Sequence, residues 1–184
     1  MFFVARQHKK LTVVLFMLGF IFNANLYAQP LTSYEEKFYE GNNYYHQQKY
    51  DEAIRAFSKA VELNPTFAEA YNNRGNCYKA KGNSNHAILD YNEALRWAPT
   101  SAQFYVNRGR VYLDQEELGK AFADFSKAIT LDCNCADAYS SRAIVYSLQR
   151  EYRKAWHDAN HAVSLGAQIE ESFVLKLKKL SSEE

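Results

Sequence analysis

The sequence predicts an all-α fold, in which four copies of a two-helix hairpin stack and a C-terminal helix caps the last one. The first observation is a frame of residues that returns every 34 positions: "YNNRGNCY" at 71–78 returns as "YVNRGRVY" at 105–112 and "YSSRAIVY" at 139–146. A regular recurrence of this length indicates one copied structural unit. The second is that 184 residues contain 7 Gly and 3 Pro, without the alternation typical of strands.

The composition excludes some classes of protein. Hydrophobic residues make up 47% of the chain and aromatic residues 15%, which argues against disorder over most of its length. Lys and Arg number 22 against 21 Asp and Glu, and the basic residues are not clustered. A surface that binds nucleic acid gathers Lys and Arg, so nucleic acid is not an expected partner.

Residues 1–28 differ from the rest of the chain. A basic start with Arg6, Lys9 and Lys10 precedes the uncharged run "LTVVLFMLGFIF", and a small residue stands before Gln29. This pattern is typical of a secretory signal peptide cleaved before Gln29. The run is short for a membrane span of ~20 residues. We expect export to the periplasm or the exterior; the alternative is an uncleaved signal that anchors the chain in the membrane.

Each repeat contains two helices. Tyr71, Gly75 and Tyr78 have the spacing of one face of a first helix. The same spacing returns in a second helix at Ala87, Tyr91 and Ala94. Small residues let the helices approach closely, while the aromatic side chains fill the space beside them. One hairpin cannot bury its apolar face alone, so successive units must stack.

The frame sets the expected boundaries. We expect first helices over 34–47, 68–81, 102–115 and 136–149, and second helices over 50–63, 84–97, 118–131 and 152–165. The repeat units are 34–67, 68–101, 102–135 and 136–169. Thr32, Thr66 and Thr100 each precede a Glu or Gln by three residues, which predicts a capping box at the first helices. Residues 170–184 form a capping helix and tail, with Phe173 and Leu177 on its apolar face.

The segment "AEAYNNRGNCYKAKGNSNHAILDYNEALRWAP" resembles the tetratricopeptide repeat (TPR) family, and the resemblance covers residues 34 to 182. It implies a right-handed superhelix, or α-solenoid, whose concave groove holds segments of other proteins. Two edge units depart from the pattern. Lys37 replaces the Tyr of later units, and Ala159 replaces the aromatic residue of earlier ones.

An arginine and an aspartate recur together, sixteen residues apart. The pairs are Arg74 with Asp90, Arg108 with Asp124, and Arg142 with Asp158. In the first unit both are absent, with Glu40 and Ala56 in their places. This covariation predicts a structural ion pair that braces each hairpin; two unrelated solvated charges are the alternative.

By the resemblance, several first-helix residues face the partner-binding groove. They are Phe38, Asn42, Tyr45, Asn72, Asn76, Lys79, Val106, Arg110, Leu113, Ile144 and Leu148. The central ones are polar and could bind a peptide backbone, while apolar residues at both ends could anchor side chains. Burial of the apolar residues within a homo-oligomer is the alternative.

One subgroup of the family grips the acidic C-termini of heat-shock chaperones with a clamp of Lys, Asn and Arg. Asn42 and Asn73 match its two Asn places, but Phe38, Gln103 and Asn107 occupy its basic places. The sequence therefore predicts that this clamp is not made.

The sequence carries no residue set for catalysis and no expected cofactor. His157 and His161 lie on one helical face, but Asp158 stands where a metalloprotease has its Glu, and a third ligand is lacking, so no metal site is predicted. Cys133 and Cys135 could form a strained disulfide, take up a metal or remain as free thiols.

The leading hypothesis is an exported, non-catalytic scaffold that binds a protein or peptide; a self-associating structural protein comes second, and an exported metal protein or enzyme last.

Overall fold

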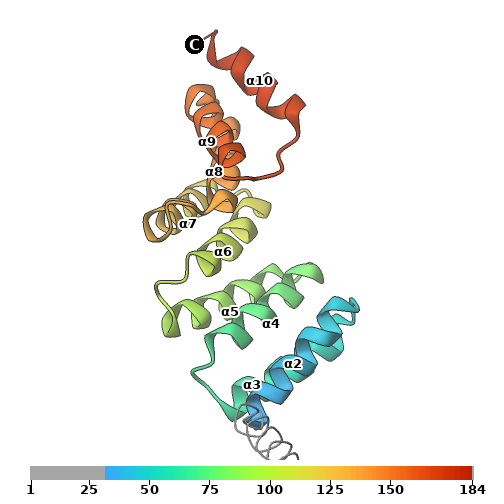
Figure 1. Ribbon diagram of the computed structural model, residues 1–184. Coiled ribbons are helices and arrows are strands. Elements are labelled where there is room, and N and C mark those ends of the chain that lie inside the picture. The colour runs from blue at the N-terminus through green and yellow to red at the C-terminus, as the bar shows by residue number, and fades with distance from the viewer. Residues whose placement is uncertain (1–31, 184) are drawn as a thin grey trace, which may run out of the picture. The chain divides into compact units, whose positions relative to one another are not determined.

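The computed structural model describes residues 32–183, and the predicted signal peptide lies outside this range. Within the range the chain forms nine α-helices and no strand, so the predicted all-α class is confirmed (Figure 1). Their bounds are α2 (Ser33–His46), α3 (Tyr50–Leu63), α4 (Ala68–Ala80), α5 (Ser84–Trp97), α6 (Ala102–Asp114), α7 (Leu118–Leu131), α8 (Ala136–Leu148), α9 (Tyr152–Ser164) and α10 (Glu171–Ser181). None of these helices combines the length and apolar character that a membrane span requires.

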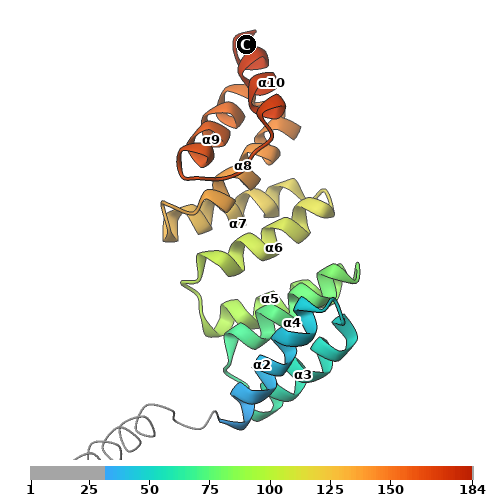
Figure 2. The ribbon, with the colours of Figure 1, turned by 45° about the vertical axis from the view of Figure 1, so that its right-hand side comes forward.

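Successive helices form four hairpins. The closest pairs are α2 with α3, α4 with α5, α6 with α7, and α8 with α9. Each second helix also packs against the next first helix, and α10 packs against α9 (Figures 1 and 2). The architecture of four hairpins plus a capping helix is therefore confirmed.

The first helices form one continuous surface. Besides the contacts within hairpins, α2 contacts α4, α4 contacts α6, and α6 contacts α8. We call the surface made by α2, α4, α6 and α8 the inner face. Side chains from consecutive repeats lie side by side on this face, so a single ligand can contact several hairpins at once.

Glycine allows close packing inside the first three hairpins. The glycine of each first helix lies under the aromatic ring of its second helix, in the pairs Gly41 with Phe57, Gly75 with Tyr91 and Gly109 with Phe125. A Cβ atom on Gly109 would lie 2.7 Å from a ring carbon of Phe125. In the fourth hairpin Ala143 replaces the glycine and Ala159 replaces the ring, and both are buried. The two departures from the repeat are thus coupled by packing.

The predicted capping boxes are wrong at α4 and α6. The N-cap residues are Phe67 and Ser101, one position after the expected threonines, and neither makes a side-chain capping bond. Thr66 instead donates its backbone N–H (3.2 Å) and its hydroxyl (2.8 Å) to Oδ1 of Asn64. The helix therefore begins too late for the threonine oxygen to accept from its first turn.

The capping helix α10 covers the end of the fourth hairpin. Leu177 is 1% exposed and packs with Ala143, Ala155 and Ala159. Leu175, on the other side of the helix, is 57% exposed. The amphipathic pattern of α10 therefore closes the apolar core, as a stacked array of repeats requires.

Candidate functional site

The recurring arginines join three helices. Arg108 of α6 donates from Nε (2.8 Å) and Nη2 (2.7 Å) to the carboxylate of Asp124 on α7. Its Nη1 donates to Oδ1 of Asn92 on α5, in the preceding hairpin, at 2.7 Å. The side chains of Arg108 and Asp124 are 20% and 7% exposed, so the pair is largely buried. This arginine braces its own hairpin and also ties it to the one before.

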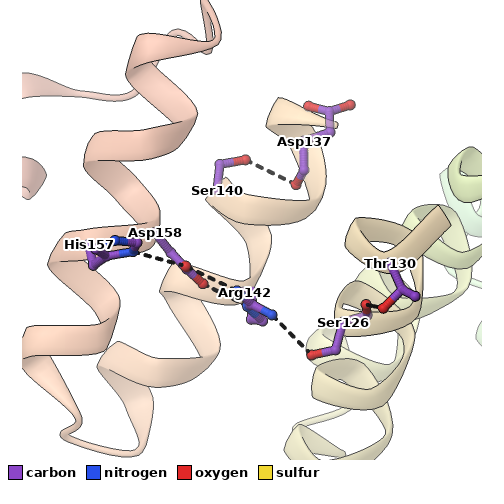
Figure 3. Close-up of polar contacts among 7 residues, drawn as sticks. All are labelled: Ser126, Thr130, Asp137, Ser140, Arg142, His157 and Asp158. Carbon is purple, nitrogen blue, oxygen red and sulfur yellow. Dashed lines mark hydrogen bonds and ion pairs between the residues drawn. The ribbon is translucent and has the colours of Figure 1, made fainter. Parts of the chain in front are cut away.

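The same arrangement occurs in the second and fourth hairpins. Arg74 pairs with Asp90 and bonds Ser58, and Arg142 pairs with Asp158 and bonds Ser126. Figure 3 shows Arg142 of α8 between Asp158 of α9 and Ser126 of α7. The residues that accept these bonds on the preceding hairpin are Ser58, Asn92 and Ser126. They also recur every 34 residues, so the sequence could have predicted them. Each of these arginines therefore links the two helices of its hairpin to the second helix of the hairpin before it.

A chain of amide hydrogen bonds runs across the inner face. Gln103 donates to Asn107 (3.0 Å), Asn107 to Asn72 (2.8 Å), Asn72 to Asn73 (3.0 Å), and Asn73 to Asn42 (2.8 Å). These residues come from α6, α4 and α2. Each amide uses its oxygen and nitrogen in turn, and bonds linked in this way strengthen one another. The chain fixes the polar centre of the inner face.

An open pocket of about 390 Å³ lies on the inner face beside this amide chain. It is lined by Tyr45 of α2, Asn76, Lys79 and Ala80 of α4, Tyr91 of α5, and Asn107 and Arg110 of α6. The lining contains two cations and no carboxylate. We call it the inner-face pocket.

Tyr91 orients the amide of Asn76 in this pocket. The side chain of Tyr91 is buried, and its hydroxyl donates to Oδ1 of Asn76 at 2.7 Å. Burial raises the pKa of Tyr91 well above its ordinary value, so the phenol stays protonated and remains a donor. Because the oxygen of Asn76 is taken, its Nδ2 is left as a donor without a hydrogen-bond partner in the described chain. The sequence pattern had indicated only a packing role for Tyr91.

The two cations of the pocket contact aspartates outside its lining. Lys79 Nζ lies 3.7 Å from Oδ2 of Asp114, and Arg110 Nη2 lies 3.0 Å from Oδ1 of Asp137. Arg110 Nε also donates to Ser141 Oγ at 3.5 Å. Both aspartates are more than half exposed, whereas both cations are about one-third exposed. The pocket thus offers partly shielded positive charge and hydrogen-bond donors.

Apolar side chains of α8 lie on the same face. Ile144 and Leu148 are 42% and 58% exposed, while Leu113 is partly buried against the core of the third hairpin. Near the other end of the face, Tyr45 packs edge-on against Tyr50. The exposed large hydrophobic side chains of the first helices are therefore Ile144 and Leu148 of α8 and Tyr39 of α2, which is 56% exposed.

Three predicted groove residues are wholly or partly covered by the neighbouring hairpin. Val106 is fully buried in the core with Phe125, so the prediction that it faces the groove is wrong. Asn72 is only 6% exposed, and Phe38 packs against Phe67 with ring centroids 4.8 Å apart. All three occupy the same place in their repeats, and the next first helix covers that place.

The residues at the clamp places bond one another. Asn42 and Asn73 share a hydrogen bond, and Gln103 and Asn107 belong to the same amide chain. Phe38 is half-buried and packs against the cores of the first two hairpins. Four of the five places therefore belong to one neutral hydrogen-bonded chain, and the fifth holds the aromatic side chain of Phe38.

The cysteines and histidines do not form a site within the part of the chain that the structure describes. Cys77 is buried, while Cys133 and Cys135 are free thiols, so the disulfide considered between them is not formed there. Burial raises the pKa of Cys77 to about 12. Residues 32–183 contain no group of three His, Cys, Asp or Glu side chains placed to hold a metal. His161 instead packs edge-on against Tyr139, at 4.5 Å between centroids.

Comparison with known proteins places these repeats in a family. A family model described as "TPR repeat" matches residues 41–82, and models described as "Tetratricopeptide repeat" match residues 68–100 and 102–135. Hsp70-Hsp90 organizing protein 3 of Arabidopsis thaliana is 40% identical over 52 residues, which are 28% of this chain and 9% of that protein. The Hsp70-Hsp90 organizing protein of Triticum aestivum is 42% identical over 52 residues, with the same shares. The chain thus spans less than a tenth of the length of these curated relatives.

Solved structures share the fold. The crystal structure of MamA protein superposes with a TM-score of 0.69 at 24% identity, covering 82% of this chain and 85% of that one. The first TPR of Spaghetti (RPAP3), bound to the HSP90 peptide SRMEEVD, gives a TM-score of 0.61 at 24% identity, covering 63% and 92%. With the register of the repeat and the four stacked hairpins, these matches show that the chain belongs to the tetratricopeptide repeat family.

Proposed function

We propose that the protein is a scaffold that holds an extended segment of another protein against its inner face. The observation that carries this proposal is the inner-face pocket, where hydrogen-bond donors and two partly exposed cations line a surface shared by several hairpins. An extended peptide presents backbone carbonyl oxygens, which need such donors. The exposed side chains of Ile144 and Leu148 would bind apolar residues of the same segment.

The family membership supports this function. Tetratricopeptide repeats are non-catalytic scaffolds, so the chain is not expected to carry an enzyme activity. The structure of Spaghetti (RPAP3) is that of a related fold with a bound peptide. The neutral amide chain at Asn42 and Asn73 favours a ligand other than a chaperone tail, because the basic residues of that clamp are replaced.

The first 28 residues are the basis for a proposal about where the protein acts. We infer that they direct export and are removed before Gln29, which would put the inner face in the periplasm or outside the cell. Mass spectrometry of the protein from its native host tests this inference. A chain that begins at Gln29 supports it, and an intact Met1 in the membrane fraction supports the anchored alternative.

Self-association is the second candidate function. The exposed side chains of Ile144 and Leu148 favour it, because apolar groups on a shared face can be buried by a second copy. Light scattering at several concentrations separates the two. A stable dimer that is lost when both residues are changed to Ser would support self-association, whereas a monomer would favour binding of another protein.

The scaffold function is tested by affinity capture from the native host. The wild type is compared with an Asn76→Ala and Arg110→Ala variant, which removes donors from the pocket. Arg55→Ala, whose side chain is 70% exposed on α3, is the control. We expect one or more partners to be lost only from the pocket variant. An unchanged set of partners would move the site away from the inner face.

A further inference from the structure

We propose that the inner-face pocket binds a carboxylate group of the partner segment, and that Asp114 and Asp137 compete with this group for Lys79 and Arg110. The proposal rests on the proposed function, since it names the chemistry of the ligand at the same site. It adds a built-in restraint on affinity, because two carboxylates of the chain already occupy the cations that the ligand needs.

The lining of the pocket selects for an anion. Asn76 Nδ2 supplies an N–H donor, the bond from Tyr91 to the amide oxygen fixes how the amide is turned, and Lys79 and Arg110 supply positive charge. The amide of Asn107 accepts one hydrogen bond from Gln103 and donates one to Asn72, so both of its polar atoms already belong to the amide chain. A carboxylate accepts several hydrogen bonds and carries one negative charge, so it satisfies these groups together.

The two cations are already used to bind carboxylates. Arg110 contacts Asp137 at 3.0 Å through one of its terminal nitrogens, and Lys79 contacts Asp114 at 3.7 Å. The side chains of Asp114 and Asp137 are 61% and 53% exposed, and neither lines the pocket. Ion pairs with exposed partners hold weakly, so an incoming carboxylate can displace these aspartates.

Competition predicts whether neutralising Asp114 and Asp137 raises or lowers the affinity for the ligand. If the aspartates restrain binding, their neutralisation removes both the contacts that the ligand must break and the repulsion between like charges. If they only hold Lys79 and Arg110 in position, their neutralisation loosens the site and weakens binding. The two roles therefore change the affinity in opposite directions.

The experiment uses short synthetic peptides with leucine at both ends and alanine and glycine between. One probe has a central glutamate and an amidated C-terminus, the second a central glutamine and a free C-terminal carboxylate, and the third a central glutamine and an amidated C-terminus. Binding to the full chain is followed by NMR, using the side-chain amide signal of Asn76. The chains compared are the wild type, the variant Asp114→Asn with Asp137→Asn, and the variant Lys79→Gln with Arg110→Gln.

A matched control is Asp51→Asn, which removes an exposed Asp–Lys pair with Lys81 away from the pocket. We expect a carboxylate probe to bind the double-Asn variant about threefold to tenfold more tightly than the wild type, the range that exposed ion pairs allow. The control should bind as the wild type does, and the double-Gln variant more weakly. Whether the glutamate or the C-terminal probe binds identifies the source of the carboxylate.

Three results would overturn the inference. Equal or weaker binding of a carboxylate probe to the double-Asn variant would exclude competition by the aspartates. Equal binding of all three probes at Asn76 would exclude a carboxylate ligand but leave peptide binding at the inner face intact. Failure of every probe to shift the Asn76 signal would refute the carboxylate site, and the scaffold function would then depend on the capture experiment alone.

Discussion

At the scale of residues, Arg108 illustrates how one side chain connects the repeats. We expect Arg108→Leu to lower the free energy of unfolding by about 3 kcal/mol, because it leaves the buried carboxylate of Asp124 unpaired. Arg55→Leu, which removes a 70% exposed side chain, should change it by less than about 0.5 kcal/mol. Urea denaturation of both variants measures the difference. Equal midpoints would show that the pair is not a brace.

The contact between Gly109 and Phe125 gives a second residue-scale prediction. Gly109→Ala should destabilise by about 1–3 kcal/mol, since the new Cβ would lie 2.7 Å from the ring and the core must shift. Gly119 of α7 has no such neighbour within 4 Å, so Gly119→Ala should stabilise by up to about 1 kcal/mol through helix propensity. The melting temperature should therefore fall for Gly109→Ala and rise for Gly119→Ala. A higher melting temperature for Gly109→Ala would contradict this packing.

Buried Cys77 predicts how stability depends on pH. Burial raises the pKa of its thiol from an ordinary 9.0 to about 12. Between these values the unfolded chain loses the proton while the folded chain keeps it, so the free energy of unfolding falls as pH rises. Buried Tyr91 acts in the same direction. Urea unfolding at several pH values above 9 should show a shallower decline for Cys77→Ala; identical slopes would count against this role of Cys77.

At the scale of elements, the two faces of α10 make a direct comparison. Leu177→Ala should lower the free energy of unfolding by about 2–5 kcal/mol, because it opens a cavity beside Ala143 and Ala159. Leu175→Ala lies on the same helix with 57% exposure and should change it by less than about 0.5 kcal/mol. If both variants unfold at the same urea concentration, α10 does not cap the core.

The helices could be predicted almost to the residue because the repeat states the same pattern four times. The period tells which side of a helix is apolar, but it does not tell which neighbour covers that side. Val106 was therefore expected on the open face, although α8 buries it. The bond from Tyr91 to Asn76 was missed for the same reason, since its hydroxyl reaches across to another helix. The capping boxes at α4 and α6 failed because a shift of one residue at a helix start removes the bond.

At the scale of the whole array, each end repeat differs from the middle repeats at two positions whose side chains contact each other. In the first hairpin Glu40 replaces the bracing arginine, and it bonds Lys37, which replaces the tyrosine. In the fourth, Ala143 and Ala159 replace the glycine and the ring. Each change is compensated by its neighbour, so the stacking persists from α2 to α10. The inner face is built from this continuous stack and depends on all of it.

The central claim is that the inner face binds a segment of another protein, and site-specific photocrosslinking tests it most directly. A photoreactive residue at Ala80, an exposed position in the lining of the pocket, is compared with one at exposed Ala123 on second helix α7. We predict that position 80 crosslinks a peptide of another protein in the native host and that position 123 does not. Crosslinks from position 123 alone, or from both positions to the same extent, would contradict the account.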